Sequence, residues 1–237
     1  MSLEGKQSLQ GKRVLVVGGS AGIGKATAAA ALAEGAAVVI ASHVEAQLEQ
    51  ARAELGGTVE TCVFDVRDPR AIDYCLAQVG ALDHLVITAA EVAAMPFVET
   101  DPDEARKILD VKFWGPFNAV QAALPYLREG GSVTLCSGIT ASRPVRGLSV
   151  VAAANGAVEA FTRALALEIC PLRVNAVSPG SVDTHELDEE RRRALANSLP
   201  VRRVGEAADV AAAVLFLMQN PYVTGTVLHI DGGKLIC

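Results

Sequence analysis

Aromatic residues and positive charge are both scarce in this sequence. Phenylalanine, tryptophan and tyrosine make up 4% of its 237 residues, so alanine, valine and leucine must supply the bulk of a core. Such small side chains suit helices that pack closely on a parallel sheet. The net charge of −6 argues against a nucleic-acid partner, because proteins of that class usually present a basic field. The basic run 191–193 follows several acidic residues and is typical of a salt-bridged helix face.

Long apolar runs, a secretion signal and paired cysteines are missing as well. No uninterrupted apolar segment approaches the roughly 20 residues of a membrane span, so we expect no membrane partner. Residues 1–8 are largely polar and lack the apolar centre of a signal peptide; we expect a flexible leader there. The five cysteines show no spacing typical of a metal or disulfide framework. These absences predict reduced thiols, no metal site and a cytoplasmic location.

Short apolar runs alternate with longer helical patterns throughout residues 9–237, which we interpret as a single domain. We expect strands at 14–17, 36–41, 59–64, 82–87, 132–136, 173–177 and 226–230. We expect helices at 22–34, 44–55, 69–79, 101–127, 149–169 and 206–218, the fourth of them kinked at Pro116 and Pro125. This alternation predicts an α/β fold in which helices cover both faces of a parallel sheet. The segments 138–147 and 181–203 are expected to form mobile walls.

A glycine-rich turn follows the first expected strand. Its residues are Gly18, Gly19, Ser20, Ala21, Gly22, Ile23 and Gly24. Glycines allow a tight turn and the close approach of a pyrophosphate, toward which the next helix directs free N–H groups and its positive dipole end. A glycine cluster between a strand and a helix predicts a dinucleotide site; the alternative is a tight turn without a ligand.

The end of the second expected strand bears on which dinucleotide binds. An acidic residue there would bind a ribose 2′-hydroxyl and repel a 2′-phosphate. This chain has Ser42 and His43 instead, Glu45 lies too far into the following helix, and Lys25 adds positive charge nearby. The pattern favours NADP(H) over NAD(H). In the alternative interpretation, Ser42 merely caps the helix that starts near Val44.

Four segments, in chain order, resemble those of short-chain dehydrogenases/reductases. They are residues 16–24 (VVGGSAGIG), Asp65-Val66, residues 174–180 (VNAVSPG), and residues 223–225 with 230–233 (VTG and IDGG). The resemblance extends from about residue 9 to the C-terminus. It implies a Rossmann-like, doubly wound parallel sheet of about seven strands, and hydride transfer between a nicotinamide cofactor and a carbonyl or alcohol substrate. It also implies a homotetramer or dimer that pairs through the helices near 101–128 and 149–169.

The same resemblance implies roles for individual residues around the cofactor. Asp65 and Val66 would hold the adenine, and Asn175 would brace the sheet. The stretch that would lie along the nicotinamide and the pyrophosphate comprises Pro179, Gly180, Val182 and Thr184. Ala89, which follows the fourth expected strand, and Lys112 would complete the cofactor contacts.

The chain departs from the family pattern where the chemistry is expected. The family's Tyr-x-x-x-Lys corresponds to Val151 and Asn155, and its catalytic serine corresponds to Gly138, next to Ser137. The asparagine of the earlier long helix corresponds to Lys112. Valine cannot donate a proton, so the family mechanism does not transfer residue by residue to this chain.

Lys112 and Asn155 suggest a reciprocal exchange of the family's asparagine and lysine. Lys112 would reach the same volume from the opposite wall, and Asn155 would hydrogen-bond it. The ammonium would hold the ribose hydroxyls and stabilise a developing oxyanion, or donate a proton if burial lowers its pKa. Alternatively, Lys112 lies on a helix surface and Asn155 is a tolerated polar residue. Ser137 is a further candidate donor.

Other polar residues near these positions have weaker claims on the site. Candidate lining residues are Thr140, Ser149, Glu91 and His185. Arg143 and Arg146 flank the loop after the fifth expected strand. They would attract an acidic substrate, unless they are simply solvated.

The sequence leaves three functions open. The first is an NADP(H)-dependent oxidoreductase that acts on a small carbonyl or alcohol substrate with a non-standard proton donor. The second is a catalytically inactive dinucleotide-binding or scaffold protein. The third is an enzyme that performs a non-redox step and keeps the cofactor for structure.

Overall fold

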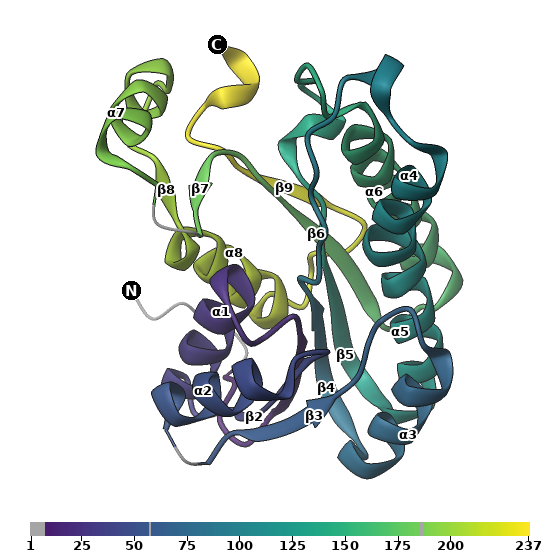
Figure 1. The fold of residues 1–237 in the computed structure, drawn as a ribbon. Coiled ribbons are helices and arrows are strands. Elements are labelled where there is room, and N and C mark those ends of the chain that lie inside the picture. The colour runs from purple at the N-terminus through teal and green to yellow at the C-terminus, as the bar shows by residue number, and fades with distance from the viewer. Residues whose placement is uncertain (1–7, 57, 185–186) are drawn as a thin grey trace.

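A parallel sheet of seven strands organises the computed structural model, which describes residues 8–56, 58–184 and 187–237 (Figure 1). The strand order is β3-β2-β1-β4-β5-β6-β9. The strands are β1 (Arg13–Val17), β2 (Ala37–Ser42), β3 (Glu60–Val63), β4 (Leu82–Ile87), β5 (Leu127–Cys136), β6 (Arg173–Pro179) and β9 (Val227–Ile230). The predicted doubly wound, Rossmann-like sheet is thereby confirmed. Most of the expected leader and His185 lie outside the described residues.

Helices cover both faces of this sheet (Figure 1). They are α1 (Gly22–Ala33), α2 (Glu45–Leu55), α3 (Pro69–Val79), α4 (Pro102–Leu109), α5 (Gly115–Ala123), α6 (Ser149–Glu168), α7 (Glu189–Ser198) and α8 (Ala207–Gln219). One core joins the sheet to α3, α5 and α6, and the other joins it to α1, α2 and α8. Within β1, Leu15 and Val17 belong to the first core and Val14 and Val16 to the second. This division follows from the alternation of side chains along a strand.

The strand order reverses beside β1, with β2 on one side and β4 on the other. Ligands of open parallel sheets bind outside the carboxyl ends of the strands at such a reversal. The carboxyl ends of β1, β2, β4, β5 and β6 therefore position the candidate site. The short parallel pair β7 (Val182–Asp183) and β8 (Gly205–Glu206) flanks the same end together with α7 (Figure 1).

The long helix expected at 101–127 is divided. α4 runs into a π-helical turn at Asp110–Trp114, α5 follows, and a 3-10 turn occupies Leu124–Tyr126. Pro116 lies in the first turn of α5, where a missing N–H costs little, so the irregular turn comes before the proline rather than at it. The segment 181–203, expected only as a wall, contains β7 and α7.

Two features differ from the sequence expectations. Cys62 and Cys75 form a disulfide, so the expectation of reduced thiols is wrong for these two. They are 13 residues apart in the sequence, and this spacing does not indicate that β3 and α3 lie in contact. α6 is long and apolar enough, by length and composition alone, to cross a membrane. Asn155, Glu159 and Arg163 interrupt its apolar residues, so no uninterrupted apolar run marks it in the sequence. In the structure α6 packs on the sheet.

Candidate functional site

The glycine turn after β1 has a backbone that side chains would disrupt. Gly18 and Gly22 have φ angles of 84° and 49°, a region that favours glycine. A Cβ at Gly24 would lie 2.1 Å from the Gly18 carbonyl oxygen, so α1 packs directly against the turn. Ala21, the N-cap of α1, offers no side-chain hydrogen bond to the first N–H groups. The turn therefore leaves the helix N-terminus open to an anion.

Segments distant in sequence meet at this turn. A Cβ at Gly22 would lie 3.3 Å from the Thr184 methyl group, and one at Gly18 would lie 2.7 Å from the Ala89 nitrogen. Thr88 Oγ1 donates to the carbonyl of Val17 at 3.1 Å. Ala89 and Thr184, both predicted from the family resemblance as cofactor contacts, thus lie beside the glycines.

Ser42 ends β2 next to the turn, where the Gly18 nitrogen donates to the Ala41 carbonyl at 2.8 Å. Val44 is the N-cap of α2, and no side chain caps that helix, so the alternative in which Ser42 acts as a cap is wrong. Lys25 forms an exposed ion pair with Glu54 at 2.6 Å. Its charge is therefore compensated, which weakens the argument for NADP(H) that rested on Lys25.

Asp65 lies in the loop after β3, at the predicted adenine end. Its carboxylate accepts hydrogen bonds from the Arg67 side chain, the shortest at 2.6 Å, and from the Arg67 backbone N–H at 2.9 Å. These bonds, and to a smaller degree the charge of His43, hold the pKa of Asp65 below its ordinary value. The carboxylate therefore keeps its negative charge while Arg67 occupies one side of it.

Lys112 lies in the π-helical turn between α4 and α5, and its side chain is buried. Its Nζ donates to the Ser137 carbonyl at 3.1 Å and to the Cys136 carbonyl at 3.4 Å. Burial lowers the pKa of this ammonium. The alternative in which Lys112 lies on a helix surface is therefore wrong, and the ammonium sits at the carboxyl end of β5.

Asn155 is buried on α6, but it does not bind Lys112 as predicted. Its Nδ2 donates to Thr140 Oγ1 at 2.8 Å, while the backbone carbonyls at the end of β5 take the Lys112 ammonium. A Cβ at Gly138 would lie 2.8 Å from Asn155 Nδ2, so the amide fills the space above that glycine. Among the described residues, Asn155 Oδ1 has no hydrogen-bond partner although it is buried.

The Ser137 hydroxyl is already engaged. Its Oγ donates to Glu159 Oε1 at 3.1 Å, and it approaches the Val177 carbonyl at 3.3 Å. This engagement argues against Ser137 as the donor to a substrate oxygen. Sequence reasoning missed Glu159, although its position one helical turn after Asn155 is the signal that places both on one face of α6. Val151 is buried with Ile108 and carries no polar atom.

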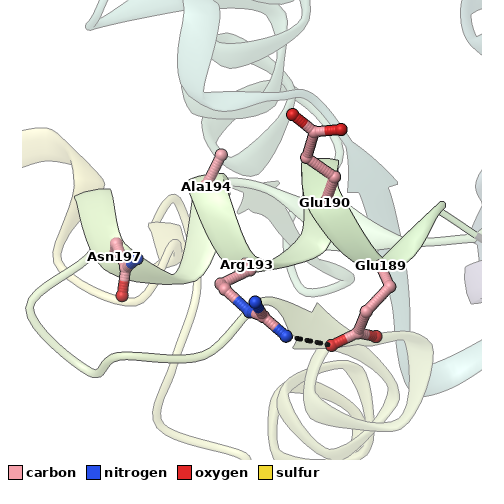
Figure 2. Close-up of a pocket in the computed structure, with 5 residues that line it drawn as sticks. All are labelled: Glu189, Glu190, Arg193, Ala194 and Asn197. Atoms are coloured by element: carbon pink, nitrogen blue, oxygen red, sulfur yellow. Dashed lines mark ion pairs between the residues drawn. The ribbon is translucent and has the colours of Figure 1, made fainter.

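A pocket lies along α7, and none of the predicted site residues lines it (Figure 2). Its lining residues are Glu189, Glu190, Arg193, Ala194 and Asn197. Arg193 pairs with Glu189 at 3.7 Å, so the basic run 191–193 does form part of a salt-bridged helix face. Within residues 8–56, 58–184 and 187–237, no cluster of His, Cys, Asp and Glu side chains is arranged to hold a metal ion.

Comparison with known proteins matches nearly the whole chain. A family model described as enoyl-(acyl carrier protein) reductase matches residues 17–234. A short-chain dehydrogenase/reductase, ATR9, from Stachybotrys chlorohalonatus is 32% identical over 254 residues, covering 97% of this chain and 99% of that protein. The chain belongs to the short-chain dehydrogenase/reductase family. Human L-xylulose reductase is likewise 32% identical, over 97% of this chain and 98% of its own length.

Solved structures agree with this membership. The short-chain dehydrogenase/reductase from Brucella melitensis superposes with a TM-score of 0.91 and 27% identity, over 98% of this chain and all of that one. A small-chain dehydrogenase in complex with NADPH is 36% identical, with a TM-score of 0.83, over 96% of this chain and all of that one. As a family member, the chain is an oxidoreductase with an NAD(P)-binding Rossmann fold.

Proposed function

We propose that this short-chain dehydrogenase/reductase transfers hydride between NADP(H) and a small carbonyl or alcohol substrate, with Lys112 in place of the usual tyrosine as the polar group at the reacting oxygen. One observation carries the proposal. The Lys112 ammonium is buried at the carboxyl end of β5 and is bound there by two backbone carbonyls. Ligands of open parallel sheets bind at this edge.

The residues at the carboxyl ends of the strands fit a dinucleotide. The open N-terminus of α1 and the glycines before it suit a pyrophosphate, and Asp65 suits the adenine. The unpartnered Asn155 Oδ1 is a buried acceptor that a ribose hydroxyl would satisfy. NADP(H) would supply or accept the hydride; these residues would hold and orient it. The absence of an acidic side chain at Ser42 and His43, and the relative in complex with NADPH, support NADP(H) over NAD(H).

Lys112 can donate a hydrogen bond or a proton to the reacting oxygen, as the family's tyrosine does. Two of its three N–H groups meet carbonyls, and the third has no partner among the described residues. A positive charge fixed in a dry site stabilises an oxyanion more strongly than it would in water. Because burial lowers the pKa of Lys112, the ammonium also gives up its proton more readily.

No tyrosine elsewhere in the chain restores the usual motif. The three tyrosines and the residues four positions after them are Tyr74 with Gln78, Tyr126 with Gly130, and Tyr222 with Thr226. The absence of Tyr-x-x-x-Lys supports a second candidate function, that of a catalytically inactive dinucleotide-binding or scaffold protein. The intact glycine turn supports both functions equally, so activity must separate them.

The deciding experiment measures NADPH oxidation against a panel of aldehydes and ketones. We expect turnover by the wild-type protein and its loss in Lys112→Met. Lys107→Met is the matched control, because Lys107 is exposed on α4 and pairs with Glu104 at 2.6 Å. Cofactor binding without turnover of any substrate would favour the inactive alternative. Full activity in Lys112→Met would contradict the role of that residue.

We also propose a homo-oligomer that pairs through α5 and α6. Trp114 is half exposed just before α5 and contacts Phe113 and Phe117 in edge-to-face geometry. Leu167 on α6 is 80% exposed. Apolar side chains exposed on neighbouring helices are typical of a surface that another subunit covers. Trp114→Glu should lower the mass measured by light scattering, whereas Tyr222→Glu, another exposed aromatic, should not; equal masses would contradict this interface.

A further inference from the structure

The C-terminal residues connect the loop after β5 with the segment after β6 at the carboxyl end of the sheet. Lys234, in a 3-10 turn after β9, donates from Nζ to Ser181 Oγ at 2.8 Å. The Arg143 guanidinium donates to the Lys234 backbone carbonyl, and its Nη1 lies 3.4 Å from Cys237 Sγ. In Figure 1 this tail (yellow) lies at the same end of the sheet as α7. Arg143 and Lys234 thus approach one another from opposite walls.

These two cations form no ion pair with a carboxylate of the described residues. Both side chains are partly buried, and no carboxylate of the described residues lies within 4.0 Å of either. Burial lowers the pKa of Lys234 and the charge of Arg143 lowers it further, against the smaller opposing effects of Cys237 and Asp231. The carboxylate of Asp231 is held by the backbone N–H groups of Gly233 and Leu235 at 2.9 and 2.7 Å. Two half-buried like charges are unfavourable together unless an anion joins them.

The position of the pair links it to the reacting centre. Ser181 directly follows Gly180, and Arg143 lies three residues after Thr140, whose hydroxyl accepts from Asn155. The pair therefore lies in the segments that follow the carboxyl ends of β5, β6 and β9, the end of the sheet that also holds Lys112. Nε and Nη2 of Arg143 have no partner among the described residues, which leaves the edge of the guanidinium that binds carboxylate or phosphate in a two-pronged manner.

We propose that Arg143 and Lys234 bind an anionic group, a carboxylate or a phosphate, on the carbonyl substrate. The proposal rests on the proposed function. Arg143 holds the oxyanion through its free edge, and Lys234 neutralises it from the opposite wall. The carbonyl of the same molecule then extends toward Lys112. The preferred substrates are accordingly carbonyl compounds that carry one acidic group.

Turnover of three matched aldehydes tests this specificity in the presence of NADPH. They are 4-formylbenzoate, 4-formylphenyl phosphate and the neutral methyl 4-formylbenzoate. Arg143→Gln and Lys234→Gln should each lower kcat/KM for an acidic aldehyde about tenfold or more, and leave the neutral ester unchanged. Arg146→Gln is the matched control, because Arg146 is exposed in the same loop and loses the same charge. Comparing kcat/KM for 4-formylbenzoate with kcat/KM for 4-formylphenyl phosphate identifies whether the site prefers a carboxylate or a phosphate.

Equal losses on acid and ester in Arg143→Gln would show that Arg143 only fixes the tail, and would overturn the proposal. A binding measurement separates this failure from failure of the proposed function. Terephthalate, which has no carbonyl to reduce, is titrated calorimetrically into the NADPH-saturated protein and into the protein alone. Binding that Arg143→Gln and Lys234→Gln weaken, and Arg146→Gln does not, supports the anion site even if nothing turns over. Terephthalate binding that is absent, or equal in all variants, overturns it.

Discussion

A cation is buried at each end of the strands, at the amino ends (the amino edge) and at the carboxyl ends (the carboxyl edge). The two cations differ in their hydrogen-bond partners. At the amino edge, Arg173 donates to the carbonyls of Leu217, Met218 and Val223, at 2.6 to 3.1 Å. The first two of these carbonyls belong to the last turn of α8, where the helix dipole favours a positive charge. At the carboxyl edge, Lys112 meets two carbonyls and keeps one N–H without a partner among the described residues.

The difference separates a structural cation from a functional one. Arg173 is bound at both terminal nitrogens by the chain itself, so it fixes α8 against the sheet. Both cations leave one donor without a partner among the described residues, Nε of Arg173 and the third N–H of Lys112. Only the donor of Lys112 lies at the carboxyl ends of the strands, where ligands of such sheets bind. The comparison teaches that neither burial nor an unpartnered donor alone identifies a site residue; its place at the carboxyl ends of the strands, where ligands bind, does so.

The largest effect should come from Arg173→Met. The substitution leaves the Leu217 and Met218 carbonyls without this donor, while Asn175 Nδ2 still donates to the Val223 carbonyl at 3.0 Å. It should lower the free energy of unfolding by about 4 kcal/mol. Chemical denaturation measures this. Lys12→Met, which removes a partly exposed cation from the same edge, should cost far less. Equal costs would break the contrast between a buried and an exposed cation.

His84 should make the amino edge sensitive to acid. The imidazole is buried beside Ser132 Oγ at 2.9 Å, and burial lowers its pKa from 6.5 to about 4. The folded protein therefore keeps His84 neutral where the unfolded chain already takes up a proton. The contribution of neutral His84 to the free energy of unfolding is fully present above about pH 6.5. It is lost as the pH drops toward 4, which lowers the free energy of unfolding by about 3 kcal/mol.

Denaturation across this pH range tests the effect. His84→Gln should flatten the dependence, whereas His229→Gln, at an exposed position on β9, should leave it in place. An unchanged slope in His84→Gln would assign the acid sensitivity to other groups.

At the carboxyl edge, Lys112→Met should divide activity from stability. Removing a buried ammonium relieves the cost of burying a charge, but it also takes a donor from the Ser137 and Cys136 carbonyls. These effects oppose one another, so the free energy of unfolding should fall by much less than in Arg173→Met. Turnover should fall at least about 10²-fold, since the polar group at the reacting oxygen is lost. Parallel denaturation and kinetics measure the two quantities. A destabilisation as large as that of Arg173→Met would show that Lys112 is structural too.

The smallest effect concerns cofactor choice at the end of β2. Ser42→Asp places a carboxylate where a 2′-phosphate would lie, and should weaken NADPH binding about tenfold relative to NADH. Calorimetric titration of both cofactors measures the ratio. Ser42→Asn is the uncharged control. Tighter binding of NADH than of NADPH by the wild-type protein would contradict the preference proposed for Ser42 and His43.

Local patterns predicted the framework well. β4 has the expected bounds of 82–87, because a short apolar run after Gly80 admits one interpretation. The glycine turn was equally predictable, because the tight backbone conformation that it needs favours glycine, so the glycines in the sequence indicate it. Both signals lie within a few consecutive residues.

Contacts between distant segments were less accessible to sequence reasoning. The burial of Lys112 follows from its place opposite the end of β5, but its partners are backbone carbonyls, which carry no sequence signal. For the same reason the predicted bond to Asn155 was wrong, as the nearby Thr140 takes that amide. The Cys62–Cys75 disulfide and the Ser137–Glu159 bond likewise depend on how helices dock, which spacing does not encode.

The π-helical turn at Asp110–Trp114 sets the angular phase of Lys112. Such a turn is equivalent to one additional residue inserted in a helix. Deleting Val111 would restore a regular helix and rotate the residues before and after it by about 100° relative to one another. The lysine would then leave the end of β5 while α4 and α5 remained helices. The position of the Lys112 ammonium at the end of β5 therefore depends on the one additional residue in this turn as well as on the lysine itself.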